Sequence, residues 1–295
     1  GQNPSVSPIV TTVYTVSVTD DNGCPSNADT QMIIVNDSLS VIAFSDTTIC
    51  IGTSANIQAL AAGGDGNYIY TWSNSVGAGS PLSVTPLLTT IYTVTVTDGC
   101  STPAVIDNVV VYVQNLPDAT FTGGGSGCDM ATVSFAANDA NNPLYNTASF
   151  SWNFGNGSGA NVRDGISYTY TTPGCYDVTY TITDNIGCES SETLINAVCV
   201  YATPLADFSY SPEAVDLLNP QVEFYDESVG NNLIYSWTFE DNVTPATSSE
   251  INPIIDFPGE SGGRYTACLT VVENNTTCTS SICKEVKIGG VLFFH

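Results

Sequence analysis

One unit of strand, turn, cysteine and strand recurs along this chain, and it limits the fold more than any other feature. Its first strand alternates apolar and polar residues, as in Thr-Thr-Val-Tyr-Thr-Val-Ser-Val-Thr-Asp at residues 11–20, and similar runs occupy residues 89–98, 176–183 and 265–273. Alternation with period two is typical of a half-buried β-strand. A turn, a cysteine and a second β-rich run follow each copy, the cysteines being Cys24, Cys100, Cys188 and Cys278. The sequence therefore predicts a repeated β-hairpin with a cysteine near each turn.

The tryptophans form a second pattern. Trp72, Trp152 and Trp237 are the chain's 3 tryptophans, and each follows an aromatic residue by two positions. Residues two apart lie on one face of a strand, and a buried tryptophan on a mid-domain strand is typical of an immunoglobulin-like sandwich core. We expect all three to be buried in their domain cores. The alternative interpretation, a row of sugar-stacking aromatic rings, requires them to be exposed.

Together with the near absence of helical periodicity, these patterns predict an all-β chain of tandem immunoglobulin-like β-sandwich domains. Short joints, some with proline, limit bending, so we expect an extended array. The predicted segments are 1–36 as the C-terminal part of a truncated immunoglobulin-like domain, 37–115 and 116–203 as complete domains, 204–288 as a further domain, and 289–295 as a linker to a following domain.

The charge balance excludes several classes of partner. The chain has 4 Lys plus Arg against 29 Asp plus Glu, a formal net charge of −25. Such a chain repels phosphate backbones and anionic lipid headgroups, so nucleic-acid binding is excluded. No apolar run approaches the roughly 18 residues that a membrane helix needs, so direct membrane insertion is excluded as well. Charged residues are only 11% of the chain, which is not the composition of a disordered acidic tail.

The 10 cysteines predict disulfides and an oxidising location, extracellular or on the cell surface. No Cys-x-x-Cys motif occurs. We expect an early-strand cysteine to bond the hairpin cysteine of its own domain, and the two cysteines on the arms of one hairpin to bond each other. The predicted pairs are Cys50–Cys100, Cys128–Cys188, Cys175–Cys199 and Cys268–Cys283. Cys24 and Cys278 are predicted to be unpaired, and a Cys278–Cys283 bond is the alternative for the last pair.

The sequence predicts no enzyme and no catalytic residue. The single histidine is His295, so a histidine-dependent nucleophile has no base within any domain. No cofactor is predicted, although calcium is the ion that suits the oxygen donors best. The calcium candidates are Asp20, Asp21 and Asp241, in stretches where aspartate is also an ordinary turn former.

Two motifs stand out in residues 116–203: Trp-Asn-Phe-Gly-Asn-Gly at residues 152–157 and Tyr-Thr-Thr-Pro-Gly-Cys-Tyr-Asp-Val at residues 170–178. With these motifs the segment resembles the PKD (polycystic-kidney-disease) domain, except that Asn156 stands where the family has aspartate. Residues 204–288 keep Trp237 and Phe239 but lack the Gly-Asp-Gly, and resemble a divergent member. The resemblance implies PKD-type sandwiches, accompanied at 1–36 and 37–115 by shorter immunoglobulin-like repeats.

The repeated Thr-x-Tyr-Thr-Val style is similar to that of large surface proteins of Bacteroidota, including gliding-motility adhesins exported by the type IX system. This resemblance implies a structural stalk or adhesin segment of a large secreted cell-surface protein, which mediates surface adhesion or gliding motility. The partners it implies are cell-surface or extracellular glycans and proteins, with type IX secretion and outer-membrane anchoring components acting through a following C-terminal domain. It also makes Ser38 and Thr47 candidates for O-glycosylation. The alternatives are an accessory PKD-type module of a secreted hydrolase and a carbohydrate-binding module.

Overall fold

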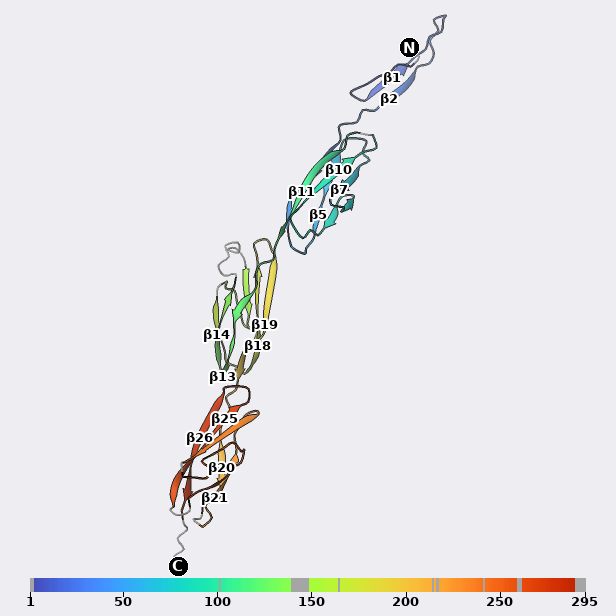
Figure 1. Ribbon diagram of the computed structural model, residues 1–295. Helices are drawn as coiled ribbons and strands as arrows, with labels where there is room; N and C mark the ends of the chain where they lie inside the picture. The colour runs from blue at the N-terminus through green and yellow to red at the C-terminus, as the bar shows by residue number, and fades with distance from the viewer. Residues whose placement is uncertain are drawn as a thin grey trace, which may run out of the picture. The chain divides into compact units, whose positions relative to one another are not determined.

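Within the part of the chain that the structure describes, the named elements are all β-strands. The computed structural model describes residues 3–100, 102–138, 149–163, 165–213, 215, 218–240, 242–258 and 262–289. The chain divides into two compact units, one of Gly1–Pro117 with Asp184–Glu189 and one of Asp118–Thr183 with Ser190–His295. Figure 1 shows the strands of each unit. Among the described residues there is no helix long and apolar enough to cross a membrane.

The first unit begins with an antiparallel hairpin of β1 (Thr12–Val16) and β2 (Asp29–Ile33), followed by a β-sandwich. One layer of this sandwich is a five-stranded sheet in the order β4-β11-β10-β7-β8, and the other consists of the pairs β3-β6 and β5-β9. The strands are β3 Ser40–Ala43, β4 Thr47–Cys50, β5 Ala55–Ile57, β6 Ala59–Ala62, β7 Ile69–Trp72, β8 Gly77–Ala78, β9 Leu82–Val84, β10 Thr90–Thr97 and β11 Val105–Gln114.

The second unit contains two further sandwiches with the same plan. The first has a three-stranded sheet, β12-β14-β17, and a five-stranded sheet, β13-β19-β18-β15-β16. Its strands are β12 Phe121–Gly123, β13 Gly125–Cys128, β14 Ala131–Ala137, β15 Ser149–Asn153, β16 Gly159–Ala160, β17 Ile166–Tyr170, β18 Gly174–Thr183 and β19 Glu189–Tyr201.

The second of these sandwiches has the sheets β20-β21-β24 and β23-β22-β25-β26. Its strands are β20 Phe208–Ser211, β21 Gln221–Asp226, β22 Leu233–Phe239, β23 Thr247–Ser248, β24 Ile254–Asp256, β25 Gly263–Glu273 and β26 Thr279–Ile288. The all-β class of tandem immunoglobulin-like sandwiches is therefore confirmed.

The alternating strands bury one face, as the period-two pattern requires. In β10 the side chains of Tyr92, Val94 and Val96 are at most 5% exposed, while the threonines between them are half-buried. Three separate cores result, and their buried residues fall within residues 39–111, 119–200 and 206–288. Each core lies inside one of the ranges predicted for a domain.

In the sandwiches at 37–115 and 116–203, a short edge strand pairs in parallel with the sandwich's last strand. Strand β4 runs parallel to β11, with Cys50 opposite Gln114. Strand β13 runs parallel to β19, with Cys128 opposite Tyr201. In the last sandwich the same place holds a single parallel bridge between Val215 and Ile288. This parallel edge strand places its final residue beside the end of the sandwich where the last strand finishes.

The prediction of three buried tryptophans is confirmed. Trp72, Trp152 and Trp237 are 3%, 1% and 0% exposed. Each indole Nε1 also donates a hydrogen bond to a backbone carbonyl, at 2.8 Å, 3.0 Å and 2.9 Å respectively. The indole N–H groups are therefore hydrogen-bonded inside the sandwiches, and the buried rings are not available to stack on a sugar.

Replacing Trp152 with alanine is expected to lower the free energy of unfolding of its sandwich by about 3–5 kcal/mol, because a large buried ring and its contacts are lost. The measurement is a urea titration of the full chain followed by circular dichroism. The matched control is Ile195→Ala in the same sandwich, since Ile195 is 68% exposed and its change should stay within about 0.5 kcal/mol. An equal decrease in the free energy of unfolding for the two variants would contradict the assignment of Trp152 to the core.

Candidate functional site

The loops that join the last two strands of each sandwich, and the loop of the β1–β2 hairpin, carry four of the chain's cysteines. We call these loops the hairpin tips; they comprise residues 17–28, 98–104, 184–188 and 274–278. In the tip at 184–188, Asp184 is 6% exposed, and its Oδ1 accepts hydrogen bonds from the amides of Ile186 at 3.0 Å and Cys188 at 2.8 Å. The carboxylate thus fixes the turn and holds Cys188 in one position.

Cys188 forms a disulfide with Cys50, the last residue of the parallel edge strand β4. The two Cα atoms are 5.5 Å apart, a usual spacing for a disulfide. Cys188 is fully buried, and the tip that carries it belongs by its contacts to the first unit. A cysteine of the sandwich at residues 37–115 is therefore bonded to the hairpin tip of the sandwich that follows it in the chain.

The same connection is made once more. Cys128 ends the parallel edge strand β13 and bonds to Cys278, in the tip between β25 and β26, again with a Cα–Cα distance of 5.5 Å. Cys278 is 1% exposed. Two successive sandwiches therefore use one arrangement, in which the edge-strand cysteine of one sandwich bonds the tip cysteine of the next.

The predicted pairs Cys50–Cys100 and Cys128–Cys188 are wrong, and the parallel edge strand explains why. Cys50 lies at the end of β11, opposite Gln114, whereas Cys100 lies in the loop before β11 begins. A strand of this length spans about 30 Å, far beyond the roughly 4–7 Å between the Cα atoms of a disulfide. β19 separates Cys128 from Cys188 in the same way.

The remaining cysteine predictions have mixed outcomes. The cross-strand bonds Cys175–Cys199 and Cys268–Cys283 are confirmed, with Cα–Cα distances of 4.1 Å and 4.0 Å. The expectation that Cys278 is unpaired is wrong, because it bonds Cys128, and this also removes the Cys278–Cys283 alternative. Cys24 is free, as predicted, and Cys100 is free too.

The two bonds between sandwiches overlap along the chain. The Cys50–Cys188 bond spans a sequence separation of 138 and the Cys128–Cys278 bond one of 150. Residues 128–188 lie inside both loops. If the chain unfolds with its disulfides intact, the shortest covalent route from Cys50 to Cys278 runs through both bonds and about 60 residues of backbone, roughly 200 Å at full extension. Without the bonds it is about 230 residues, more than 700 Å.

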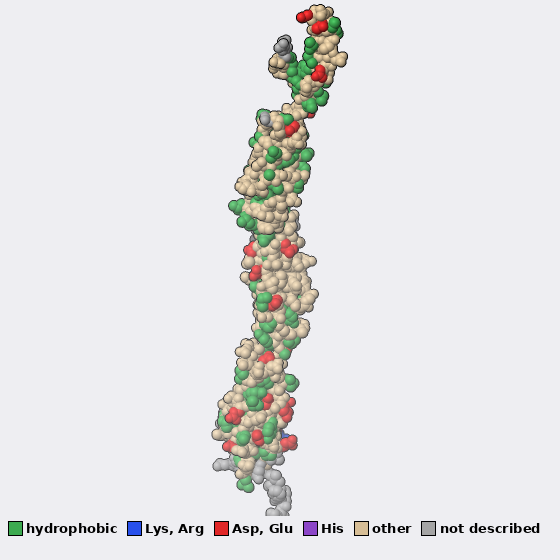
Figure 2. Space-filling model, turned by 90° about the vertical axis from the view of Figure 1, so that its right-hand side faces the viewer, with side chains coloured by type: hydrophobic (Ala, Val, Ile, Leu, Met, Phe, Trp, Pro, Cys, Tyr) green, Lys and Arg blue, Asp and Glu red, His purple; other side chains and the backbone are tan. Residues whose placement is uncertain are grey.

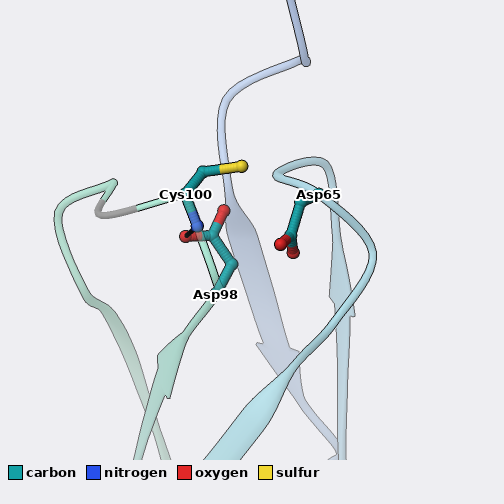
Figure 3. A group of neighbouring side chains, drawn as sticks. All are labelled: Asp65, Asp98 and Cys100. Atoms are coloured by element: carbon teal, nitrogen blue, oxygen red, sulfur yellow. Dashed lines mark hydrogen bonds between the residues drawn. The ribbon is translucent and has the colours of Figure 1, made fainter.

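The tip at residues 98–104 differs from the others. Asp65 comes from one loop, and Asp98 and Cys100 come from the tip; one ligand atom from each lies within 4.8 Å of the other two (Figure 3). The Asn67 amide donates a hydrogen bond to Asp65 and lowers the pKa of that carboxyl. Asp98 Oδ1 accepts from the Cys100 amide at 3.1 Å and from the Thr102 hydroxyl at 2.7 Å. These acids therefore organise their own loops. Two carboxylates and a thiol also fall short of the oxygen shell that calcium needs.

The sequence-predicted calcium candidates are not brought together with a third ligand in the described residues. Asp20 Oδ1 accepts the amides of Asn22 at 2.9 Å and Cys24 at 2.8 Å, so this carboxylate forms a turn. Asp21 is exposed in the same turn, and Asp241 lies outside the described residues. Of the glycosylation candidates, Ser38 is exposed and Thr47 is half-buried in β4. Calcium binding and O-glycosylation stay predictions.

On the face shown in Figure 2, acidic side chains are scattered over the surface and do not form one cluster. In the last sandwich, Arg264 and Lys287 form ion pairs with Glu285, and Lys284 forms one with Asp207. Lys284 Nζ lies 2.6 Å from an Asp207 carboxylate oxygen and 4.9 Å from the Phe208 ring centre. These contacts tie β20 to β26, and they account for basic residues that would otherwise suggest an anion site.

Peptide mapping of the unreduced chain is expected to recover the links Cys50–Cys188 and Cys128–Cys278. Cys50→Ser should release Cys188 and raise the reactive thiols of the denatured, unreduced chain from two, Cys24 and Cys100, to three. The matched control is Ser45→Ala, which alters the same sandwich without touching a cysteine and should leave the thiol count unchanged. Recovery of a Cys50–Cys100 peptide would contradict the arrangement.

Comparison with known proteins gives one family match and several similar solved structures. Residues 114–199 match a family model described as the PKD domain. A search of curated proteins finds no match to the chain. The similar solved structures include the titin I-band fragment I67–I69 (10% identity, 87% of this chain and 99% of that chain, TM-score 0.42), the ICAM-5 D1–D4 ectodomain fragment (10%, 86% and 78%, 0.35) and mouse cadherin-23 EC22–24 (14%, 86% and 99%, 0.32). The chain is thus an all-β tandem of immunoglobulin-like sandwiches whose residues 114–199 match the PKD domain.

Proposed function

We propose that this chain is a structural segment of an extracellular, adhesion-type protein, in which covalent links between sandwiches limit how far the segment extends under load. The observation that carries the proposal is the pair of overlapping disulfides, Cys50–Cys188 and Cys128–Cys278. Such bonds form and persist in oxidising compartments outside the cytosol. Each backbone joint between the bonded sandwiches is thereby doubled by a second covalent connection.

The position of the bonds supports a mechanical role more than a role in stabilising single domains. The cross-strand bonds at Cys175–Cys199 and Cys268–Cys283 each lie within one hairpin, where they stabilise a local structure. The two longer bonds instead join residues of different sandwiches, each of which already has its own buried core. These two bonds therefore limit how far successive sandwiches can separate, and how far the chain can extend after one sandwich unfolds.

The finer parts of the proposal follow from the sequence resemblance. We propose surface adhesion or gliding motility as the process, with cell-surface glycans or proteins as partners and type IX secretion and anchoring components acting through a further domain. The alternative of a sugar-binding module predicted exposed indole rings, and the burial of all three removes that support. The chain alone is proposed to have no enzymatic activity.

Single-molecule pulling of the full chain tests the mechanical proposal. With disulfides intact, the contour between residues 50 and 278 should not exceed about 200 Å, whereas after reduction it should exceed roughly 700 Å. The double variant Cys50→Ser, Cys128→Ser is the matched control, because it should release the long contour without reductant while keeping the two cross-strand bonds. If the unreduced chain extends as far as the double variant, the proposed limit on extension does not exist.

A further inference from the structure

The tip that carries the free Cys24 has the same backbone design as the tip that carries the bonded Cys188. Both have the spacing Asp-x-x-Gly-Cys, at residues 20–24 and 184–188. In each, the aspartate Oδ1 accepts the amides two and four residues further on, at 2.9 Å and 2.8 Å for Asp20 and at 3.0 Å and 2.8 Å for Asp184. The cysteine is the second of these donors in both tips.

The other hydrogen bonds of the two tips match as well. The aspartate amide donates to the cysteine carbonyl at 3.1 Å for Asp20 and at 2.9 Å for Asp184. The glycine amide donates to the aspartate carbonyl at 2.9 Å for Gly23 and 3.2 Å for Gly187, and these glycines have φ of 82° and 92°. Positive φ is easily adopted by glycine, so both sequences select the same turn. Cys24 is therefore presented as Cys188 is.

What differs is the surroundings. Cys188 and Cys278 are buried and bonded to the edge-strand cysteines Cys50 and Cys128, whereas Cys24 is exposed and free. Two tip cysteines of this chain thus already have the same kind of disulfide partner. That partner is the last residue of an edge strand, which runs parallel to the final strand of the preceding sandwich.

The strands beside Cys24 independently indicate that something covers them. Residues 11–20 repeat residues 89–98. Both hairpins have the same hydrogen bond, in which the amide of Val35 or Val113 donates to the hydroxyl oxygen of Thr11 or Thr89 at 3.1 Å. In the complete sandwich Val94 and Val96 are 0% exposed. Their counterparts Val16 and Val18 are 59% and 62% exposed. The β1–β2 hairpin therefore has the sequence of a sandwich wall without the facing layer.

We propose that Cys24 is a disulfide site of the same kind, and that its partner is a cysteine ending a parallel edge strand in an immunoglobulin-like sandwich carried ahead of the β1–β2 hairpin in the same polypeptide. In forming the bond, the two thiols lose two protons and two electrons. A disulfide oxidant such as oxidised glutathione accepts them and is reduced to two thiols. Cys24 then becomes the downstream end of a further link between successive sandwiches.

Cys100 is not offered the same role, because its tip lacks the hydrogen-bonded design that the tips of Cys24 and Cys188 share. It follows Asp98 by two residues where Cys24 follows Asp20 by four. Asp98 Oδ1 is shared between the Cys100 amide and the Thr102 hydroxyl, so Thr102 occupies the position, four residues after the aspartate, that cysteine takes in the tips of Cys24 and Cys188. Cys100 therefore serves as an internal comparison for the test.

The test supplies the partner from the chain's own repeats. Residues 37–88 are repeated ahead of Thr11, with their Cys50 changed to serine, so that they complete β1–β2 as a sandwich. A full copy of 37–115 is placed ahead of that. After expression under oxidising conditions, peptide mapping should link the Cys50 of the added full copy to Cys24. Changing that Cys50 to serine is the matched control and should leave Cys24 alkylated as a free thiol.

The proposal is overturned if Cys24 stays a free thiol in the extended chain while Cys50–Cys188 and Cys128–Cys278 of the original portion form normally. It is equally overturned if the added Cys50 bonds the Cys100 of its own copy.

A second variant does not depend on folding of the added segments. Asn185→Asp with Ile186→Asn converts the tip at 184–188 into the sequence of residues 20–24, and the Cys50–Cys188 bond should still form completely. Loss of that bond would show that the tip of Cys24 cannot present a cysteine for this linkage.

Discussion

The parallel pairing of a short edge strand with the last strand of its sandwich is the constraint on which the covalent structure depends. A parallel neighbour must run in the same direction as the last strand, so its final residue lies where that strand leaves the sandwich. Cys50 and Cys128 occupy this final position. Had either edge strand been antiparallel, its last residue would lie beside the start of the final strand, near the hairpin tip of its own sandwich.

The last sandwich shows what the same position does without a cysteine. Val215 forms the parallel bridge with Ile288, is 1% exposed, and packs in the core with Phe208 and Val286. The edge position can therefore serve either as a core residue or as a link to the next sandwich. Within the described residues, the link is formed only where the edge strand ends in cysteine.

Local patterns in the sequence predicted local structure well. Period-two alternation identified the hairpins, the tryptophan spacing identified the cores, and the two arms of a hairpin identified Cys175–Cys199 and Cys268–Cys283, because each of these signals lies within one element or one turn. The pairing of Cys50 with Cys188 could not be read in this way. It depends on the parallel alignment of Thr47 with Val111, a contact between residues far apart in the chain that leaves no periodic trace.

If the chain is pulled as proposed, the sandwich at 116–203 receives load at two defined points, because residues 128–188 lie inside both long loops. These are the hairpin tip at Cys188 and the edge-strand end at Cys128, which β19 separates by about 40 Å along the strand direction. Load applied at opposite ends of parallel neighbours shears them, and the ladder of hydrogen bonds between β13 and β19 then resists together and not one bond at a time.

The core behind this sheet is dense in aromatic contacts, such as Trp152 with Tyr180 at 4.4 Å and Phe154 with Tyr168 at 4.0 Å between ring centres. Each such pair contributes about 0.5–1.5 kcal/mol beyond burial. The placement of the bonds and the composition of this core thus favour the same outcome, in which the sandwich at 116–203 resists the load that the two bonds direct to it.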